Sequence, residues 1–180
     1  MEKNLIQIYQ LEMIKGYTTA NLDRLSQVVL QNSSKTLDEH PRQTGFEDSY
    51  CPDSAIIDRI VEDMQEVYSE FQSKSSSLSF PKKGRLSLIG KWGHVHEKNM
   101  STNTHDHKPA DVSAVTYLKV SKESGQLKFN PNPLHDYSYT IPPKKGMFLL
   151  FPGWLPHSVN RNLSNESRIS VSFNFKLEEA

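Results

Sequence analysis

Two histidines flank a single acid in the segment THDHKPAD, residues 104–111. If the chain is extended here, His105 and His107 project from the same face and Asp106 from the other, because side chains alternate along a strand. Paired imidazoles favour iron, zinc, copper or nickel over calcium and magnesium, which prefer oxygen ligands. An H-x-H pair is a weak signal by itself, and a polar surface loop explains it equally well.

A third histidine follows the strongly apolar segment GMFLLFPGWLPHSV. No polar residue occurs between Met147 and Phe151, which predicts a strand that is buried on both faces. The Pro152-Gly153 turn would then bring His157 out of the core at a defined place. A simple turn histidine explains His157 alone just as well, but the three histidines together predict a metal site.

The segment RISVSFNFKL provides a candidate anion site. Its alternation separates two faces, one with Ile169, Val171, Phe173 and Phe175 and the other with Arg168, Ser170, Ser172 and Asn174. The polar face is either the solvated side of a sheet or the lining of a pocket. In the second case Arg168 would offer a carboxylate a fork of donors, and Ser170 would add a hydroxyl.

The elements that must position these residues change character along the chain. Apolar periodicity predicts one amphipathic helix around residues 20–32 and another after the segment CPDS, both packed against a sheet, with a long polar loop between them. From about residue 84 the chain contains only short β patterns: GRLSLIGKW, DVSAVTYLKV, QLKF, YSYTI, GMFLLF and RISVSFNFKL. Such a run favours an antiparallel sandwich or barrel.

Length and composition limit the remaining possibilities. A chain of 180 residues favours a single domain, 1–180. Twenty-one basic residues balance twenty-one acidic ones, which argues against nucleic acid as a partner. Cys51 is the only cysteine, so an internal disulfide is impossible. No apolar segment has the length of a signal peptide or membrane span, and we expect a soluble, cytoplasmic protein.

The order of these motifs resembles the double-stranded β-helix (jelly-roll, cupin-like) dioxygenases that use Fe(II) and 2-oxoglutarate. The closer resemblance is to the putative 2-oxoglutarate/Fe(II) oxygenase family of marine bacteria and phages. It rests on Trp92, thirteen residues before the histidine pair, on HDHKP followed by VSAVTYL, and on FPGWLPH and RISVSFN. The resemblance covers residues 84–176, which would form the catalytic core after a helical part over residues 1–80. It also allows a phage origin.

The resemblance assigns roles to individual residues. His105 and His157 correspond to the iron-binding histidines. Arg168 and Ser170 match the pair that holds the distal carboxylate of 2-oxoglutarate, and Tyr117 matches a tyrosine that hydrogen-bonds the same group. His107 falls where most of the wider superfamily has Asp, although the closer family also reads H-x-H.

The position of His107 affects the charge of the site. Two histidines and one carboxylate cancel one of the two charges of Fe(II), whereas three neutral histidines cancel none. We expect His107 to be the third ligand. Asp106 is the alternative and requires that the chain is not extended there.

A second H-x-H pair, His94 and His96 in WGHVH, allows two explanations. These residues either line the pocket or support the ligands, or they belong to a half-exposed strand with no further role. Trp92 and Trp154 are expected to serve packing, and either could form a wall of the pocket.

The function that the resemblance implies is a dioxygenase, specifically a hydroxylase. It would use Fe(II), 2-oxoglutarate and O2, act on an unidentified prime substrate, and release succinate and CO2. One alternative is a cupin-type three-histidine metalloenzyme that does not use 2-oxoglutarate. Another is a non-catalytic jelly-roll module that serves in binding or in a virion.

Overall fold

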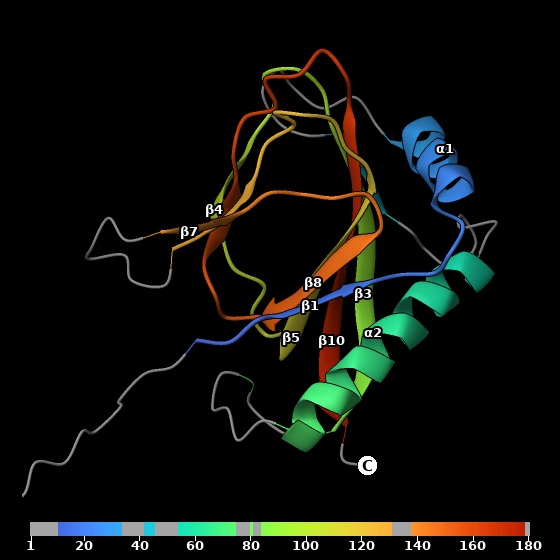
Figure 1. The fold of residues 1–180 in the computed structure, drawn as a ribbon, viewed down its shortest axis with the longest axis vertical. Helices are drawn as coiled ribbons and strands as arrows, with labels where there is room; N and C mark the ends of the chain where they lie inside the picture. The colour runs from blue at the N-terminus through green and yellow to red at the C-terminus, as the bar shows by residue number, and fades with distance from the viewer. Residues whose placement is uncertain are drawn as a thin grey trace, which may run out of the picture.

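The computed structural model describes residues 11–33, 42–45, 54–74, 80, 84–130 and 138–178. The N-terminal part forms β1 (Ile14–Tyr17), α1 (Leu22–Asn32), β2 (Arg42–Gly45) and α2 (Ser54–Lys74). The rest of the described chain forms only strands: β3 (Arg85–His96), β4 (Thr102–His105), β5 (Val112–Lys119), β6 (Leu127–Phe129), β7 (Tyr139–Ile141), β8 (Met147–Pro152), β9 (His157–Val159) and β10 (Arg168–Glu178). Figure 1 shows this course from blue to red.

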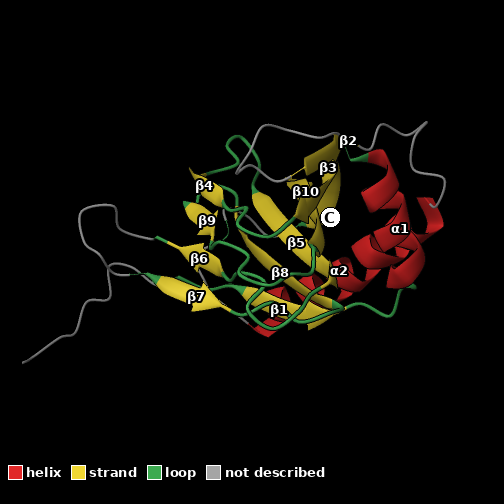
Figure 2. Ribbon diagram, turned by 90° about the horizontal axis from the view of Figure 1, so that it is seen from above, coloured by secondary structure: helices red, strands yellow, loops and turns green. Residues whose placement is uncertain are grey.

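The strands form two antiparallel sheets. The major sheet has the order β1-β8-β5-β10-β3-β2, and the minor sheet has the order β4-β9-β6-β7. Figure 2 shows the two sheets side by side, with both helices beyond the major sheet. The molecule therefore has three layers: helices, major sheet and minor sheet. Neither helix in the described ranges combines the length and apolar character needed to cross a bilayer.

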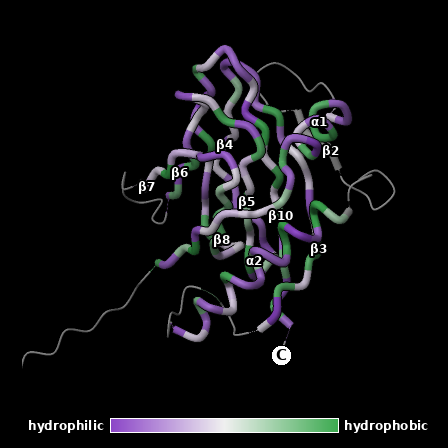
Figure 3. Tube along the Cα trace, turned by 45° about the vertical axis from the view of Figure 1, so that its right-hand side comes forward, coloured by the Kyte–Doolittle hydropathy of each residue, from purple (hydrophilic) through white to green (hydrophobic). Residues whose placement is uncertain are grey.

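The helices cover the outer face of the major sheet, as predicted. Their buried side chains are Leu22, Leu25, Val28 and Val29 in α1 and Ile57, Ile60, Met64 and Tyr68 in α2. These residues join alternate side chains of the sheet in one hydrophobic core. Along α2, hydrophilic and hydrophobic residues alternate, which is the pattern of a helix with one buried face (Figure 3). Leu30, an apolar residue of the same helix, is 42% exposed and does not belong to this buried face.

A buried carboxylate fixes α2 to the end of β1. Asp63 accepts hydrogen bonds from the hydroxyl of Thr18 at 2.6 Å and from the backbone N–H of Thr19 at 2.8 Å. Arg59, one turn earlier on the helix, donates to the same carboxylate at 2.6 Å. Because Asp63 is only 5% exposed, its charge is compensated by these contacts rather than by water.

A second hydrophobic core lies between the two sheets. It contains Val115, Tyr117, Leu127, Phe129, Met147, Leu149, Phe151 and Leu155. The alternate residues of β8, Phe148 and Leu150, belong to the first core under the helices. The prediction that this strand is buried on both faces is therefore confirmed, because all of β8 is buried.

The structure also contains strands that the β patterns do not predict. β1 and β2 come from the N-terminal part and close the two edges of the major sheet. β2 lies within the segment that was predicted as a long loop, so that prediction is wrong for Arg42–Gly45. The short strands β4 and β9 belong to the minor sheet. Their sequences, TNTH and HSV, lack an apolar alternation because little of their surface faces a core.

Candidate metal centre and anion site

Three histidines converge at one end of the minor sheet. One ring nitrogen from each of His105, His107 and His157 can be chosen so that all lie within 4.8 Å of one another. The centroid of the His157 ring is 4.4 Å from that of His105 and 5.0 Å from that of His107. Strand pairing causes part of this convergence, because β4 and β9 place His105 directly opposite His157.

Backbone carbonyls orient two of the three rings. The Nδ1 atom of His105 lies 2.8 Å from the carbonyl oxygen of Asn103, and that of His157 lies 2.9 Å from the carbonyl oxygen of Leu155. A carbonyl only accepts, so both Nδ1 atoms carry the proton and donate it. The Nε2 lone pairs of both rings are then free for a metal ion, an arrangement that is common around metal-bound histidines.

His107 lies beyond the end of β4 and is held by its backbone. Its N–H donates to the carbonyl of Gly153 at 2.8 Å, and its own carbonyl accepts from Ala110 at 2.8 Å. Gly153 in turn donates to the carbonyl of Asp111 at 3.1 Å. β4 ends at His105, so the extended strand assumed through residue 106 is not present. The rings of His105 and His107 nevertheless lie with their centroids 4.9 Å apart.

The carboxylate of Asp106 is engaged elsewhere. It accepts a hydrogen bond from the backbone N–H of Lys108 at 3.2 Å, and the Lys108 ammonium lies 3.4 Å away. These contacts, the backbone bond first, lower the pKa of Asp106. The group that could hold a metal contains His107 and not Asp106.

The imidazoles of His107 and His157 are neutral at ordinary pH. Burial lowers the pKa of His157 to about 3 and, together with His105, lowers the pKa of His107 to about 4. Only the neutral ring has a lone pair to donate, so a low pKa keeps the side chain competent to bind a metal.

Arg168, at the start of β10, is a buried cation. It is only 2% exposed, and within the described ranges no carboxylate lies within ion-pair distance of it. Its Nη1 donates to the carbonyl of Gly125 at 3.1 Å and its Nη2 to Nδ1 of His96 at 3.1 Å, while Nε is buried without a partner. Burial lowers the pKa of Arg168 to about 10, which still leaves it charged. A buried charge without a counter-ion is costly, and a bound anion would relieve that cost.

Cross-strand pairing brings further polar groups beside Arg168. On β10, Ser170 pairs with Tyr117 of β5 on one side and with His94 of β3 on the other. The Tyr117 ring centroid lies 5.9 Å from Cζ of Arg168. Burial raises the pKa of Tyr117 to about 12, so its hydroxyl stays protonated and can donate. The polar face of β10 is therefore turned inward.

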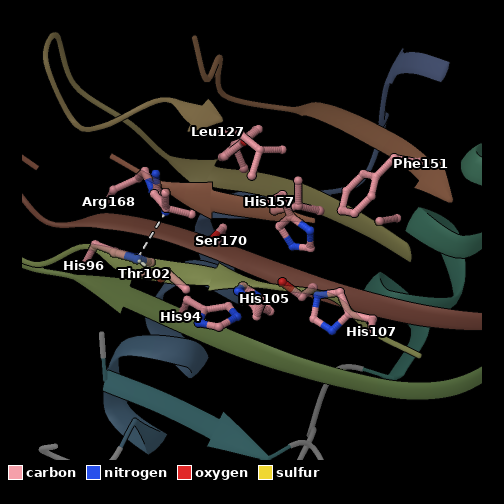
Figure 4. A pocket seen from close by; sticks show the side chains of 15 residues that line it. His94, His96, Thr102, His105, His107, Leu127, Phe151, His157, Arg168 and Ser170 are labelled. Carbon is pink, nitrogen blue, oxygen red and sulfur yellow. Dashed lines mark hydrogen bonds between the residues drawn. The ribbon is translucent and has the colours of Figure 1, made fainter. Parts of the chain in front are cut away.

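One pocket between the sheets joins the two groups. All six residues expected in the site line it: His105, His107, His157, Arg168, Ser170 and Tyr117. Figure 4 shows the three histidines toward one end, Arg168 at the other and Ser170 between them. The pocket is thus suited to a molecule that offers a carboxylate at one end and metal-binding atoms at the other.

The structure also decides between the two explanations of His94 and His96. Both line the pocket, and His96 is 1% exposed and bonded to Arg168. The sequence feature that points to this placement is the alternation in WGHVH, which puts both imidazole rings on the same face of a strand. Two contributors were not predicted: Thr102, which bonds His96, and Gly125, which accepts from Arg168. Neither belongs to a pattern that sets it apart from other polar or turn residues.

Comparison with known proteins agrees with this site. A family model described as "Putative 2OG-Fe(II) oxygenase" matches residues 133–174, the segment that contains His157, Arg168 and Ser170. A search of curated proteins finds no match.

Solved structures of several enzymes share the fold of this chain. The non-heme alpha ketoglutarate dependent carbocyclase SnoK from nogalamycin biosynthesis is 11% identical with a TM-score of 0.67, covering 92% of this chain and 79% of that chain. An oxidoreductase of the 2OG-Fe(II) oxygenase family from Burkholderia pseudomallei is 13% identical with a TM-score of 0.66. The match covers 88% of this chain and 79% of that chain. A prolyl-4-hydroxylase from Pseudomonas putida is 13% identical with a TM-score of 0.61. The match covers 92% of this chain and 94% of that chain.

The donor set fits the groups that this family implies, Fe(II) and 2-oxoglutarate. The three histidines offer neutral nitrogen ligands, which iron accepts. The partnerless Nε of Arg168 is a donor that a carboxylate oxygen would satisfy. The expected mainly β fold with N-terminal helices and a double-stranded β-helix core is confirmed, and so is the resemblance to the 2-oxoglutarate/Fe(II) oxygenases, by the matched segment and the shared fold.

Proposed function

We propose that this protein is an Fe(II)- and 2-oxoglutarate-dependent dioxygenase that hydroxylates its substrate. The observation that carries the proposal is the presence of a three-histidine cluster and a buried, uncompensated guanidinium in one pocket. In this proposal His105, His107 and His157 ligate the metal. Arg168 binds the distal carboxylate of 2-oxoglutarate.

The residues of the chain would act by binding and orientation. Arg168 receives the distal carboxylate through its free N–H groups, and the hydroxyls of Ser170 and Tyr117 lie on the same face of the sheet. This contact would direct the 2-oxo acid end of the molecule toward the histidines. When bound, iron and 2-oxoglutarate supply the oxidising chemistry, with O2 as oxidant and succinate and CO2 as products.

The remaining walls of the pocket would exclude water. They include Leu127 and Val159 from the minor sheet and Ala114, Val115 and Phe151 from the major sheet. An apolar lining strengthens the contact between Arg168 and a carboxylate, because the two charges are not screened by solvent. No acidic side chain lines the described pocket, so the chain's own part in the reaction is to position the reactants.

Hydroxylation is proposed as the outcome, although the fold also serves other reactions. Among the structural neighbours, one is a prolyl-4-hydroxylase and another a carbocyclase. The prime substrate would decide which atom is oxidised, and it is unidentified.

The ligand set is tested by anaerobic addition of Fe(II) and 2-oxoglutarate. We expect a visible charge-transfer band, and we expect His157→Ala to abolish it because the metal loses a ligand that the strand pairing holds in place. Asp106→Asn is the matched control: it removes a carboxylate that lies outside the cluster and should leave the band unchanged. Absence of the band and of succinate formation in protein that binds metal would refute the proposal.

The role of Arg168 is tested by Arg168→Gln. Loss of a charge-assisted contact worth about 1.5–3 kcal/mol should weaken 2-oxoglutarate binding roughly 10- to 150-fold. Calorimetric titration of the Mn(II)-loaded protein measures this change, and Mn(II) affinity itself should not change. Equal affinities in the two proteins would favour a cupin-type metalloenzyme that does not use 2-oxoglutarate. Failure of Mn(II) or Fe(II) to raise the Tm would favour a non-catalytic module.

A further inference from the structure

We propose that His96 is a positioning residue of the anion site: as a neutral acceptor fixed by Thr102, it holds the guanidinium of Arg168 in the orientation that receives a carboxylate. The inference rests on the proposed function and adds to it a residue that contacts neither the metal ligands nor, in this scheme, the cosubstrate. Figure 4 shows the bond between His96 and Arg168, at the end of the pocket opposite His107.

Hydrogen-bond chemistry determines which nitrogen of His96 carries the proton. A guanidinium has five N–H donors and no acceptor, so Nδ1 of His96, 3.1 Å from Nη2 of Arg168, must be the unprotonated nitrogen. Nε2 then carries the proton and donates it to the hydroxyl of Thr102 at 2.9 Å. Nη2 also lies 3.4 Å from Nε2, but the shorter contact of Nε2 is with Thr102.

Two acceptors from opposite layers restrict the guanidinium. His96 belongs to β3 in the major sheet, and Gly125, which accepts from Nη1, lies just before β6 of the minor sheet. With both Nη atoms held, rotation of the planar group would break at least one bond. The partnerless Nε and the second proton of each Nη remain for a ligand.

The His96 ring is itself well anchored. Its residue pairs directly with Arg168 across the β3–β10 ladder, and its carbonyl accepts a bond from the amide of Asn162 at 2.9 Å. Thr102 opens β4, the strand that ends at His105. The Thr102–His96–Arg168 chain therefore connects the strand of one metal ligand to the anion site.

A neutral acceptor suits this place better than a charged one. A carboxylate here would form an ion pair with Arg168 and compete with the incoming anion, while a protonated imidazole would repel the guanidinium. A neutral imidazole orients Arg168 and leaves its charge uncompensated. Burial, with Arg168 and His94 nearby, holds the pKa of His96 well below its usual value, in agreement with this role.

The first test compares His96→Leu with His96→Asn in the Mn(II)-loaded protein. His96→Leu removes the acceptor and should weaken 2-oxoglutarate binding about tenfold by calorimetry. His96→Asn can place its amide oxygen close to the position of Nδ1 and should recover affinity to within about threefold of the wild type. Binding of pyruvate, a 2-oxo acid without a distal carboxylate, and of Mn(II) should not change in either variant, because the effect passes through Arg168.

A double-mutant cycle with Arg168→Gln checks the route of the effect. If His96 acts only through Arg168, the variant that carries both His96→Leu and Arg168→Gln should bind 2-oxoglutarate no more weakly than Arg168→Gln alone. Independent, additive losses would overturn the inference, and so would wild-type affinity in folded His96→Leu.

Histidine tautomers give a readout that needs no ligand. In 15N-labelled wild-type protein, NMR should show His96 neutral with its proton on Nε2; a proton on Nδ1 would overturn the inference without touching the proposed function. Failure of the wild-type protein to bind 2-oxoglutarate at all would refute the proposed function and this inference with it. Binding that is equal in the wild type and both variants would refute the inference alone.

Discussion

At the scale of single residues, the charge of the pocket depends on the absence of acidic side chains from its described lining. Histidines that ligate a metal carry no charge of their own, so a set of three leaves the full charge of a bound divalent metal in place, and Arg168 adds another positive charge. A dianion such as 2-oxoglutarate would compensate only part of this charge. The site is therefore expected to bind anions more strongly than a site with two histidines and one carboxylate.

Introducing a carboxylate at position 107 tests this expectation. In the proposed ligand set, His107→Asp should retain a metal ligand but cancel one positive charge of the site. Because charges interact strongly at short range, 2-oxoglutarate should then bind the Mn(II) form about tenfold more weakly or worse. Calorimetric titration measures the change. His107→Asn, which removes the imidazole without adding charge, is the control. Tighter 2-oxoglutarate binding by the Asp variant than by the Asn variant would contradict the argument.

The sequence allowed some of these residues to be predicted and not others. His157 and Arg168 stand out because their side chains are chemically distinctive and lie next to recognisable strand patterns, and His105 stands out as part of an H-x-H pair. The parts played by Thr102 and Gly125 arise from hydrogen bonds that span 6 and 43 residues. Such contacts depend on how the sheets fold together, and no local pattern encodes them.

At the scale of elements, the position of His107 depends on the loop that follows β4. The carbonyl of Gly153, in the turn after β8, accepts a hydrogen bond from the N–H of His107. The space around Gly153 does not admit a side chain, because a Cβ there would lie 2.2 Å from the carbonyl oxygen of Ala110. The loop and the turn would have to move apart to relieve such a clash. His107 would move with the loop.

Gly153→Ala should therefore weaken metal binding without unfolding the sheets. We expect a loss of about 10- to 100-fold, the range seen when the groups that orient metal ligands are disturbed. Mn(II) titration and circular dichroism measure the two effects. Gly90→Ala is the matched control, because its Cβ would meet no atom closer than 3.8 Å. Wild-type metal affinity in Gly153→Ala would show that the loop does not depend on this contact.

The elements differ in how well their sequences predict them. α1, α2, β8 and β10 were predicted because each buries a long or strictly alternating apolar surface. β1, β2, β4 and β9 are three or four residues long and gain their structure mainly from strand partners that are distant in sequence. Their local composition resembles that of a loop, and only the pairing registers distinguish them.

At the scale of the whole molecule, the neutral histidines of the pocket, which are half-buried or buried, make the stability of the metal-free protein depend on pH. The pKa values of His94 and His157 are lowered to about 3 and that of His107 to about 4, in each case chiefly by burial. The unfolded chain binds these protons near pH 6.5, whereas the folded protein does not. Their contribution to stability is therefore complete above about pH 6.5 and is lost as the pH falls through the folded-state pKa values of about 4 and about 3.

The Tm of the metal-free protein should fall as the pH is lowered from 7 to 5. Each such group costs up to about 1.4 kcal/mol per pH unit, which lowers the Tm by about 3–6 °C for a chain of this size. Thermal melts in metal-free buffers measure the slope, and His94→Gln should make it shallower. The carboxyl of Asp63 affects stability only at lower pH. Burial raises its pKa, but the hydrogen bonds that it accepts and the charge of Arg59 outweigh burial, so the pKa is lowered overall. A constant Tm from pH 7 to 5 would contradict the assignment.

The place of β10 in the major sheet has a consequence for biosynthesis. β10 is the last described strand, yet it lies between β5 and β3 in the middle of the sheet (Figure 1). During synthesis on the ribosome, β3 and β5 are made before β10. The strand edges that will pair with β10 stay unpaired until it emerges, and chaperones or other nascent chains can bind them. All three candidate metal ligands are translated before Arg168 and Ser170. The pocket for a carboxylate is therefore the last part of the site to mature.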